Sequence, residues 1–276
     1  MEEREITDSA AVVRFYDAVR SSPLSAAALA HGEASIGQEC LLTPDEIAAL
    51  ARQAGVTAGT SVLDMGSGTR GPACYLAQQF GCYIVGVDIS AAGHAQAVAR
   101  ARDAGVSHQV QFRLGDIHAV ALPPASFDVI LSLDVWCHMP RRAALLQRCA
   151  TLLRAGGRLA FCDHVERQPM PAAQCQQLCA LWRFPSLETP QSYLEAVRAA
   201  RLHLRYHADT SAYTVRFYTC LLAVYRDRRA ESEAMRGPER YLEGLARLQM
   251  SQQCATTGVL GQLVCIAEKP TDGCRG

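Results

Sequence analysis

Between residues 60 and 165, short runs of apolar residues alternate with longer segments of helical periodicity. A short apolar run bounded by turn residues indicates a buried strand, and strands that alternate with helices are typical of βαβ units around a mainly parallel sheet. The pattern therefore predicts an α/β fold. The predicted strands are Ser61–Leu63, Tyr83–Val87, Val110–Leu114, Phe127–Leu133 and Arg158–Cys162. The predicted helices are Pro72–Gln79, Ala91–Ala104 and Arg141–Leu153, the last of which is expected to stop at a left-handed glycine in Ala155-Gly156-Gly157.

The segments on either side of this core are mainly helical in pattern. Residues 8–55 contain one helical pattern through Ala10–Val19 and another that starts at Thr43-Pro44-Asp45-Glu46, where a capping residue precedes a proline. We expect these helices to form a lid over the sheet edge. The helices and the strand predicted after residue 164 are Gln174–Trp182, Thr189–Ala200, a long helix near Thr214–Met235 and a final strand at Gln262–Glu268.

Charge and composition narrow the class of protein. The 276 residues contain 27 basic and 27 acidic side chains, so the chain lacks the excess of Lys and Arg with which proteins bind nucleic acids and anionic membranes. With 49% hydrophobic and 20% charged residues, the chain can bury a full core. Met1–Thr7 lacks the apolar run of a signal peptide, and no segment approaches the roughly 20 apolar residues of a membrane span, so we expect a cytoplasmic protein.

Twelve cysteines are scattered along the chain without the paired CxxC spacing of a structural zinc site. In the cytoplasm they are expected to be reduced. We interpret most of them as small apolar residues of the core, and we predict no metal site.

The segment from Val62 to Gly71 runs from a predicted strand into a glycine loop that opens a helix. Gly66, Gly68 and Gly71 fit the pattern G-x-G-x-x-G, in which glycine permits a tight turn and the close approach of a ligand. That match alone is a weak indication of a nucleotide site. Asp64 lies two residues before the first glycine, where a carboxylate would repel a pyrophosphate but pair with an ammonium group. The ligand is therefore expected to be cationic at this end.

Two further acids follow the next two predicted strands. Asp88 stands where a carboxylate accepts hydrogen bonds from both ribose hydroxyls, a feature shared with NAD enzymes. Asp116, in Gly115-Asp116-Ile117, offers a carboxylate to an adenine amino group and an apolar neighbour to the adenine face. Neighbouring parallel strands end at one crevice. Together with Asp64, these acids favour S-adenosylmethionine (SAM) over a nicotinamide dinucleotide; the open alternative is a helix-packing glycine turn in an enzyme of another kind.

With these motifs, the chain resembles the class I SAM-dependent methyltransferases over at least residues 60–165. The resemblance implies a Rossmann-like sheet of seven strands, mostly parallel with one antiparallel strand, and SAM as the cofactor with S-adenosylhomocysteine as its product. It divides the chain into an N-terminal helical lid (1–55), a SAM-binding core (56–165), a helical substrate cap with an added strand (166–235) and a C-terminal segment that completes the sheet (236–276). The cofactor-binding residues so implied are Asp64, Gly66, Ser67, Gly68, Asp88, Ile89, Asp116, Ile117 and Leu133.

Asp134 and His138 lie just past the end of the fourth predicted strand. Methyl transfer from a sulfonium is an in-line displacement, so the protein positions the nucleophile and removes its proton where necessary. The segment from Ser132 to His138 resembles the S-x-D-x-x-x-H pattern of the sarcosine/dimethylglycine and phosphoethanolamine N-methyltransferases, in which the acid and the histidine face the acceptor. The resemblance makes Asp134 and His138 the candidate catalytic pair, with a backbone hydrogen bond at a helix start as the alternative for His138.

Aromatic residues supply the remaining candidates. Phe15-Tyr16-Asp17, His31-Gly32 and Ile36-Gly37 are similar to the lid of the same N-methyltransferases, and Tyr16 would then close over the methyl group and the acceptor, unless it only holds down the first helix. Candidates for an aromatic substrate-binding wall are Trp136, Trp182, Phe184, Tyr213 and Tyr218, for each of which core packing is the alternative.

We therefore predict a SAM-dependent methyltransferase that acts on a small-molecule acceptor, with an amine nitrogen of a metabolite favoured and an oxygen or carbon of a natural product as alternatives. A second alternative is an arsenite methyltransferase, which would bind arsenic through Cys74 with Cys40, Cys175 and Cys179. A third is a SAM-binding module without catalysis. We expect a monomer or homodimer that binds neither nucleic acid nor membrane.

Overall fold

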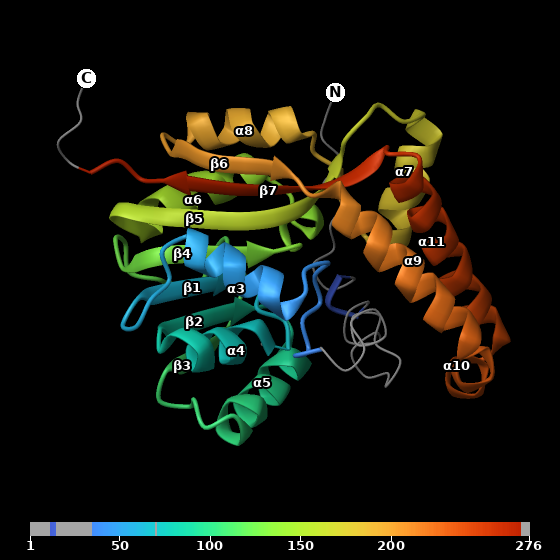
Figure 1. The fold of residues 1–276 in the computed structure, drawn as a ribbon, viewed down its shortest axis with the longest axis horizontal. Coiled ribbons are helices and arrows are strands. Elements are labelled where there is room, and N and C mark those ends of the chain that lie inside the picture. Colours follow the sequence, from blue (N-terminus) through green and yellow to red (C-terminus); the bar gives the residue numbers. More distant parts are fainter. Residues whose placement is uncertain (1–11, 15–34, 70, 272–276) are drawn as a thin grey trace.

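The computed structural model describes residues 12–14, 35–69 and 71–271. It contains a seven-stranded sheet in the order β3-β2-β1-β4-β5-β7-β6 (Figure 1). Only β7 runs antiparallel to its neighbours, so the expected mostly parallel sheet of the α/β class is confirmed. The strands are β1 (Ser61–Met65), β2 (Tyr83–Asp88), β3 (Val110–Leu114), β4 (Phe127–Leu133), β5 (Leu153–Glu166), β6 (His203–Asp209) and β7 (Leu260–Glu268).

Helices cover both faces of this sheet. Strand side chains alternate between the faces, so Val62 packs in one core cluster and its neighbour Leu63 in the other. The first face is covered by α3 (Pro44–Gln53), α4 (Gly71–Phe80) and α5 (Ala91–Asp103). The opposite face is covered by α6 (Arg142–Leu152) and α8 (Pro190–Ala199). Thr43 forms a capping box with Glu46 at the start of α3, as the sequence predicts.

A third core cluster belongs to a helical bundle at one end of the sheet. The bundle contains α7 (Ala172–Trp182), α9 (Ser211–Asp227) and α11 (Pro238–Thr256), with α10 (Arg229–Arg236) between the last two. The chain enters α7 from the end of β5 and α9 from the end of β6, so the bundle adjoins the carboxyl ends of the parallel strands. Figure 1 shows α7, α9 and α11 side by side there.

Two predictions of local structure are wrong. Helix α6 ends at Leu152, four residues before Gly156, so the glycine pair does not stop the helix. Gly156 instead has φ +76° within β5, where its N–H donates to Lys269 O at 2.9 Å. A Cβ on Gly157 would lie 3.0 Å from the carbonyl oxygen of Asp128, so glycine there permits close strand approach.

The predicted single helix near Thr214–Met235 is divided into α9 and α10, and α11 was not predicted. Tyr225 on α9 stacks on Tyr241 of α11 with 5.2 Å between ring centroids. This contact requires the chain to reverse between the two helices, which a single helix through Met235 cannot do. Within the described part of the chain, no helix is long and apolar enough to cross a membrane.

Candidate active site

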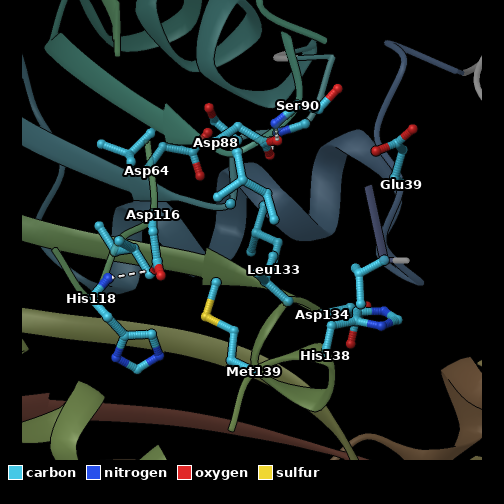
Figure 2. Close-up of a pocket in the computed structure, with 18 of the residues that line it drawn as sticks. Glu39, Asp64, Asp88, Ser90, Asp116, His118, Leu133, Asp134, His138 and Met139 are labelled. Carbon is cyan, nitrogen blue, oxygen red and sulfur yellow. Dashed lines mark hydrogen bonds between the residues drawn. The ribbon is translucent and has the colours of Figure 1, made fainter. Parts of the chain in front are cut away.

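A cavity of about 1470 Å³ lies at the carboxyl ends of the parallel strands. Its two ends differ in their lining residues. The lining of the glycine-loop half includes Asp64, residues 66–69, 87–90 and 115–117. The lining of the His138 half includes Gly37, Glu39, Cys40, Asp134, Val135, residues 138–142, Pro185, Ser186 and Glu188. In Figure 2, Asp64, Asp88 and Asp116 lie on one side of Leu133, and Glu39, Asp134 and His138 lie on the other.

The glycine loop joins β1 to α4. Gly66 and Gly68 have φ values of +70° and +54°, in the left-handed region that favours glycine. The N–H of Gly66 donates to Val87 O at 2.9 Å, which joins the loop to the end of β2. At Gly71 the constraint is steric, because a Cβ would overlap the carbonyl oxygen of Ile36. The three glycines of the motif therefore serve both the turn and the close approach of the segment around Ile36.

Asp88 is a buried carboxylate at the end of β2. Its Oδ2 accepts from the N–H of Gly68 at 2.8 Å, and its Oδ1 accepts from the N–H of Ser90 at 2.9 Å. Each carboxylate oxygen has a second lone pair. The protein therefore holds Asp88 rigidly against the cavity and leaves acceptor capacity for a ligand.

The other candidate cofactor residues surround the same half of the cavity. Asp64 is buried at the end of β1, whereas Asp116 is exposed and accepts from the N–H of His118 at 2.8 Å. Ile117 is buried and Ile89 is exposed. The structure brings all nine candidates to the cavity lining, namely Asp64, Gly66, Ser67, Gly68, Asp88, Ile89, Asp116, Ile117 and Leu133.

Asp134 and His138 both line the cavity, but in different surroundings. The Asp134 carboxylate accepts from the N–H of Leu41 at 2.7 Å and from Gln262 Nε2 at 2.9 and 3.0 Å. His138 ends the short 3-10 helix η2 (Trp136–His138), is half-buried, and packs edge-on against Phe184 with 4.9 Å between ring centroids. Asp134 is thus engaged by the protein, whereas the His138 ring forms part of the cavity surface.

None of the five aromatic candidates is among the described residues that line the cavity. Trp136 is buried against Phe161 at 4.5 Å between ring centroids, in the core under the sheet. Phe184 packs behind His138. The remaining three have polar partners: Trp182 Nε1 donates to Ser251 Oγ at 2.7 Å, Tyr218 Oη lies 3.0 Å from His164 Nε2, and the ring of Tyr213 lies under the Arg216 guanidinium. Packing accounts for these placements, and Tyr16 lies outside the described residues.

Sequence reasoning missed Arg142, which supports the wall of the His138 half. Its guanidinium is buried and has five N–H donors. Nε donates to Trp136 O at 2.8 Å, and the two Nη atoms donate to Cys137 O, to Ser186 Oγ and O, and to Glu188 Oε1 at 2.8 to 3.1 Å. These five bonds join η2 to the loop at Ser186 and Glu188. The spacing of the sequence carries no signal for the contact with the loop, because Ser186 and Glu188 lie 44 and 46 residues from Arg142.

The four cysteines of the arsenite alternative are not assembled into one site. Among the described residues, the one group of three metal-ligating side chains whose ligand atoms lie within 4.8 Å is Cys137, Asp163 and His164. Cys40 lines the cavity, and burial together with the nearby Asp134 charge raises the pKa of its thiol well above the usual range. Burial likewise raises the pKa of Cys179 to about 12. These thiols are therefore protonated, which is unfavourable for binding a soft metal ion.

Asp163, which lies below the His138 half, is a fully buried acid in a hydrogen-bond network. Its Oδ1 accepts from the N–H of Cys137 at 3.1 Å, and its Oδ2 accepts from the hydroxyl of Tyr193. Burial raises the pKa of Asp163 to about 6, although the hydrogen bond from Tyr193 and the charge of Arg142 oppose the shift. A pKa of about 6 means that Asp163 is half protonated near pH 6 and mostly ionised at pH 7.

Comparison with known proteins identifies a domain within the chain. Residues 63–161 match the family model described as a methyltransferase domain. The chain is 35% identical over 162 residues to methyltransferase GfsG of Streptomyces halstedii, with 58% of each protein covered. It is 28% identical over 156 residues to the sarcosine/dimethylglycine N-methyltransferase of Halorhodospira halochloris, covering 56% of this chain and 55% of the relative. The chain thus spans a little over half the length of these two relatives.

The fold has a close counterpart among solved structures. A putative sarcosine dimethylglycine methyltransferase from Galdieria sulphuraria superposes with a TM-score of 0.77 at 20% identity, covering 82% of this chain and 84% of that one. Other relatives are named as O- and C-methyltransferases, so the match does not fix the acceptor atom. SAM is the cofactor of this family, and solved neighbours include complexes with SAM and S-adenosylhomocysteine. The chain contains a methyltransferase domain and has the fold of the class I SAM-dependent methyltransferases.

Proposed function

We propose that this protein binds SAM in the glycine-loop half of the cavity and catalyses transfer of its methyl group to a small organic acceptor in the His138 half. The observation that carries the proposal is the convergence of Asp64, Asp88 and Asp116 from three neighbouring strands onto one cavity that continues to His138. When bound, SAM supplies an electrophilic methyl carbon on a cationic sulfonium.

The residues of the glycine-loop half fit the chemistry of this cofactor. Asp64 would pair with the ammonium group, and Asp88 would accept from the ribose hydroxyls with the lone pairs left by Gly68 and Ser90. Asp116 and Ile117 would hold the adenine by its amino group and its face. A cluster of carboxylates suits a ligand with net positive charge and disfavours a pyrophosphate.

The charge of the lining supports a neutral or cationic acceptor. Among the described lining residues of the His138 half, the acids Glu39, Asp134 and Glu188 outnumber the cations Arg141 and Arg142, and the guanidinium of Arg142 has all five donors engaged with the protein. We therefore favour an amine nitrogen of a small metabolite, which is nucleophilic once neutral and needs no strong base.

A hydroxyl of a natural product is the second candidate, and the position of His138 favours it. The imidazole forms part of the cavity surface and is oriented by Phe184. A neutral imidazole can accept the proton of a hydroxyl nucleophile as a general base. In either case His138 would hold a hydrogen bond to the nucleophile, whereas the engaged Asp134 carboxylate would not.

Two measurements test the proposal in order. Isothermal titration calorimetry with S-adenosylhomocysteine is expected to show binding to the wild-type protein, and the absence of binding would overturn the cofactor assignment. Incubation with SAM and a panel of amines and hydroxylated natural products, read by mass spectrometry, is expected to give a singly methylated product. Binding without product across a broad panel would favour the alternative of a SAM-binding module without catalysis.

A further inference from the structure

Residues 36–42 form an irregular strap that crosses the glycine loop before α3 begins. The strap has neither helix nor strand, yet Gln38, Cys40, Leu41 and Leu42 are all buried. Buried backbone outside regular structure needs hydrogen-bond partners elsewhere. Because Gly37, Glu39 and Cys40 line the cavity, the position of the strap sets the shape of the cavity.

Three side chains from distant parts of the chain hold the strap backbone. Arg100 of α5 donates from Nη1 to Ile36 O, and Thr69 of the glycine loop donates from Oγ1 to Gly37 O at 2.9 Å. At the other end of the strap, the N–H of Leu41 donates to Asp134 Oδ2 at 2.7 Å. The first two contacts fix the strap to the glycine-loop half, and the third fixes it to the His138 half.

The backbone of Asp134 turns its carboxylate toward this contact. Asp134 follows the last residue of β4 and has φ +55°, a left-handed conformation that is unfavourable for a non-glycine residue. The carboxylate is buried between Leu41 and Gln262 of β7, and His164 Nδ1 lies 3.6 Å from its Oδ1. Gln262 is itself oriented, because its Oε1 accepts from Thr210 Oγ1 at 2.9 Å.

We infer that Asp134 is a positioning residue that anchors the strap over the cavity. It does not bind the methyl acceptor. The inference rests on the proposed function in one respect, which is that the strap would enclose the bound cofactor. It differs from the role expected from the sequence, in which Asp134 and His138 act as a pair on the acceptor. The N–H of Leu41 donates to Oδ2, and Gln262 Nε2 lies within hydrogen-bond distance of both carboxylate oxygens. An asparagine at residue 134 has a single acceptor oxygen, so when this oxygen faces Leu41 its N–H₂ group faces Gln262 Nε2.

The experiment is an exchange of acceptor and donor between residues 134 and 262. In Asp134→Asn, the N–H₂ group of residue 134 opposes that of Gln262, so the anchor of the strap is weakened. In the double variant Asp134→Asn with Gln262→Glu, the carboxylate moves to residue 262 and every donor regains an acceptor. If the methyl acceptor instead required a carboxylate at residue 134, the double variant would not restore it.

Two readouts do not depend on knowing the acceptor. Hydrogen exchange of a peptide covering residues 36–42 is expected to be at least about tenfold faster in Asp134→Asn, with S-adenosylhomocysteine affinity reduced about threefold to tenfold. The double variant is expected to restore both to within about threefold of wild type. Asp163→Asn, the matched control at a buried acid that does not contact the strap, is expected to leave exchange of this peptide unchanged.

Unchanged exchange in Asp134→Asn would overturn the inference, and so would a double variant that folds by circular dichroism but stays as fast as Asp134→Asn. If Asp134→Asn fails to fold, Gln262→Glu alone supplies the test, since two opposed carboxylates are also expected to release the strap. Failure of the proposed function would give a different result, namely no binding of S-adenosylhomocysteine to the wild-type protein. Hydrogen exchange of residues 36–42 in the ligand-free protein would still test the role of Asp134.

Discussion

The two halves of the cavity are built in different ways. The glycine-loop half consists of three short segments, each at the end of a strand and each carrying its acid in a local motif: Asp64, Asp88 and Asp116. The His138 half is assembled from the strap, η2, the loop at Ser186 and Glu188, and Gln262 of β7, held together by Arg142 and Asp134. The comparison indicates that, under the proposed function, the cofactor would be held by local sequence, whereas the space for the acceptor would depend on contacts between distant residues.

The largest expected effect separates catalysis from cofactor binding. His138→Ala is expected to lower turnover of a hydroxyl acceptor about 10²- to 10⁴-fold, since it removes a general base. Its affinity for S-adenosylhomocysteine, measured by calorimetry, is expected to stay within about twofold of wild type. His108→Ala, at an exposed histidine far from the cavity, serves as the control. Turnover near the wild-type value would remove His138 from the chemistry.

The second effect belongs to the glycine-loop half. Asp88→Ala is expected to weaken S-adenosylhomocysteine binding about 10²- to 10³-fold, because the ligand loses charge-assisted hydrogen bonds worth about 1.5–3 kcal/mol each and the N–H of Gly68 loses its acceptor. The control is Asp103→Ala, at an exposed acid at the end of α5. Equal calorimetric affinities of the two variants would show that the acid at the end of β2 does not bind the cofactor.

The third effect is a pH dependence in the His138 half. The pKa of Asp163 is raised to about 6 in the folded protein. The folded state therefore binds this proton more tightly than the unfolded state, and its contribution to the free energy of unfolding falls as pH rises from about 4 to 6. A shift of about two pKa units corresponds to roughly 3 kcal/mol.

Urea denaturation between pH 4 and pH 7 measures this dependence as the difference between wild type and Asp163→Asn. The difference isolates Asp163 from the other acids. It is expected to favour wild type increasingly toward low pH. A difference that is constant across this range would contradict the raised pKa.

The smallest effect tests where the two halves meet. In Gly71→Ala the new Cβ would displace Ile36, so the free energy of unfolding is expected to fall by about 1–3 kcal/mol, with a loss of S-adenosylhomocysteine affinity. Gln79→Ala, on the exposed face of the same helix, is the control and is expected to fall within about 0.5 kcal/mol of wild type. Two variants of equal stability would show that the strap is not packed against the start of α4.

The features that could be predicted from the sequence also differ between the two halves of the cavity. The alternating pattern located the strands of the core, and the motif residues Asp64, Asp88 and Asp116 all line the cavity. Both depend on short-range information: periodicity reports burial, and a strand end followed by glycine reports a ligand loop.

The parts that could not be predicted depend on long-range contacts. Asp134 looks the same in the sequence whether its carboxylate faces a ligand or accepts from Leu41 and Gln262, which lie 93 and 128 residues away. Gly156 fits a helix stop as well as a strand irregularity until the partner strand is known. Trp136 illustrates a chemical ambiguity, because an indole suits a ligand pocket and a core equally well.

The position of β7 has a consequence for the synthesis of the protein. This strand lies between β5 and β6, so the edge of the sheet cannot close until the ribosome has translated the chain through Glu268. The ribosome adds about 5–20 residues per second, so the strands around the glycine loop can begin to fold well before Gln262 has been synthesised. During that interval the Asp134 carboxylate has been synthesised and Gln262 has not, so the His138 half cannot form its contact between these two residues until late in synthesis.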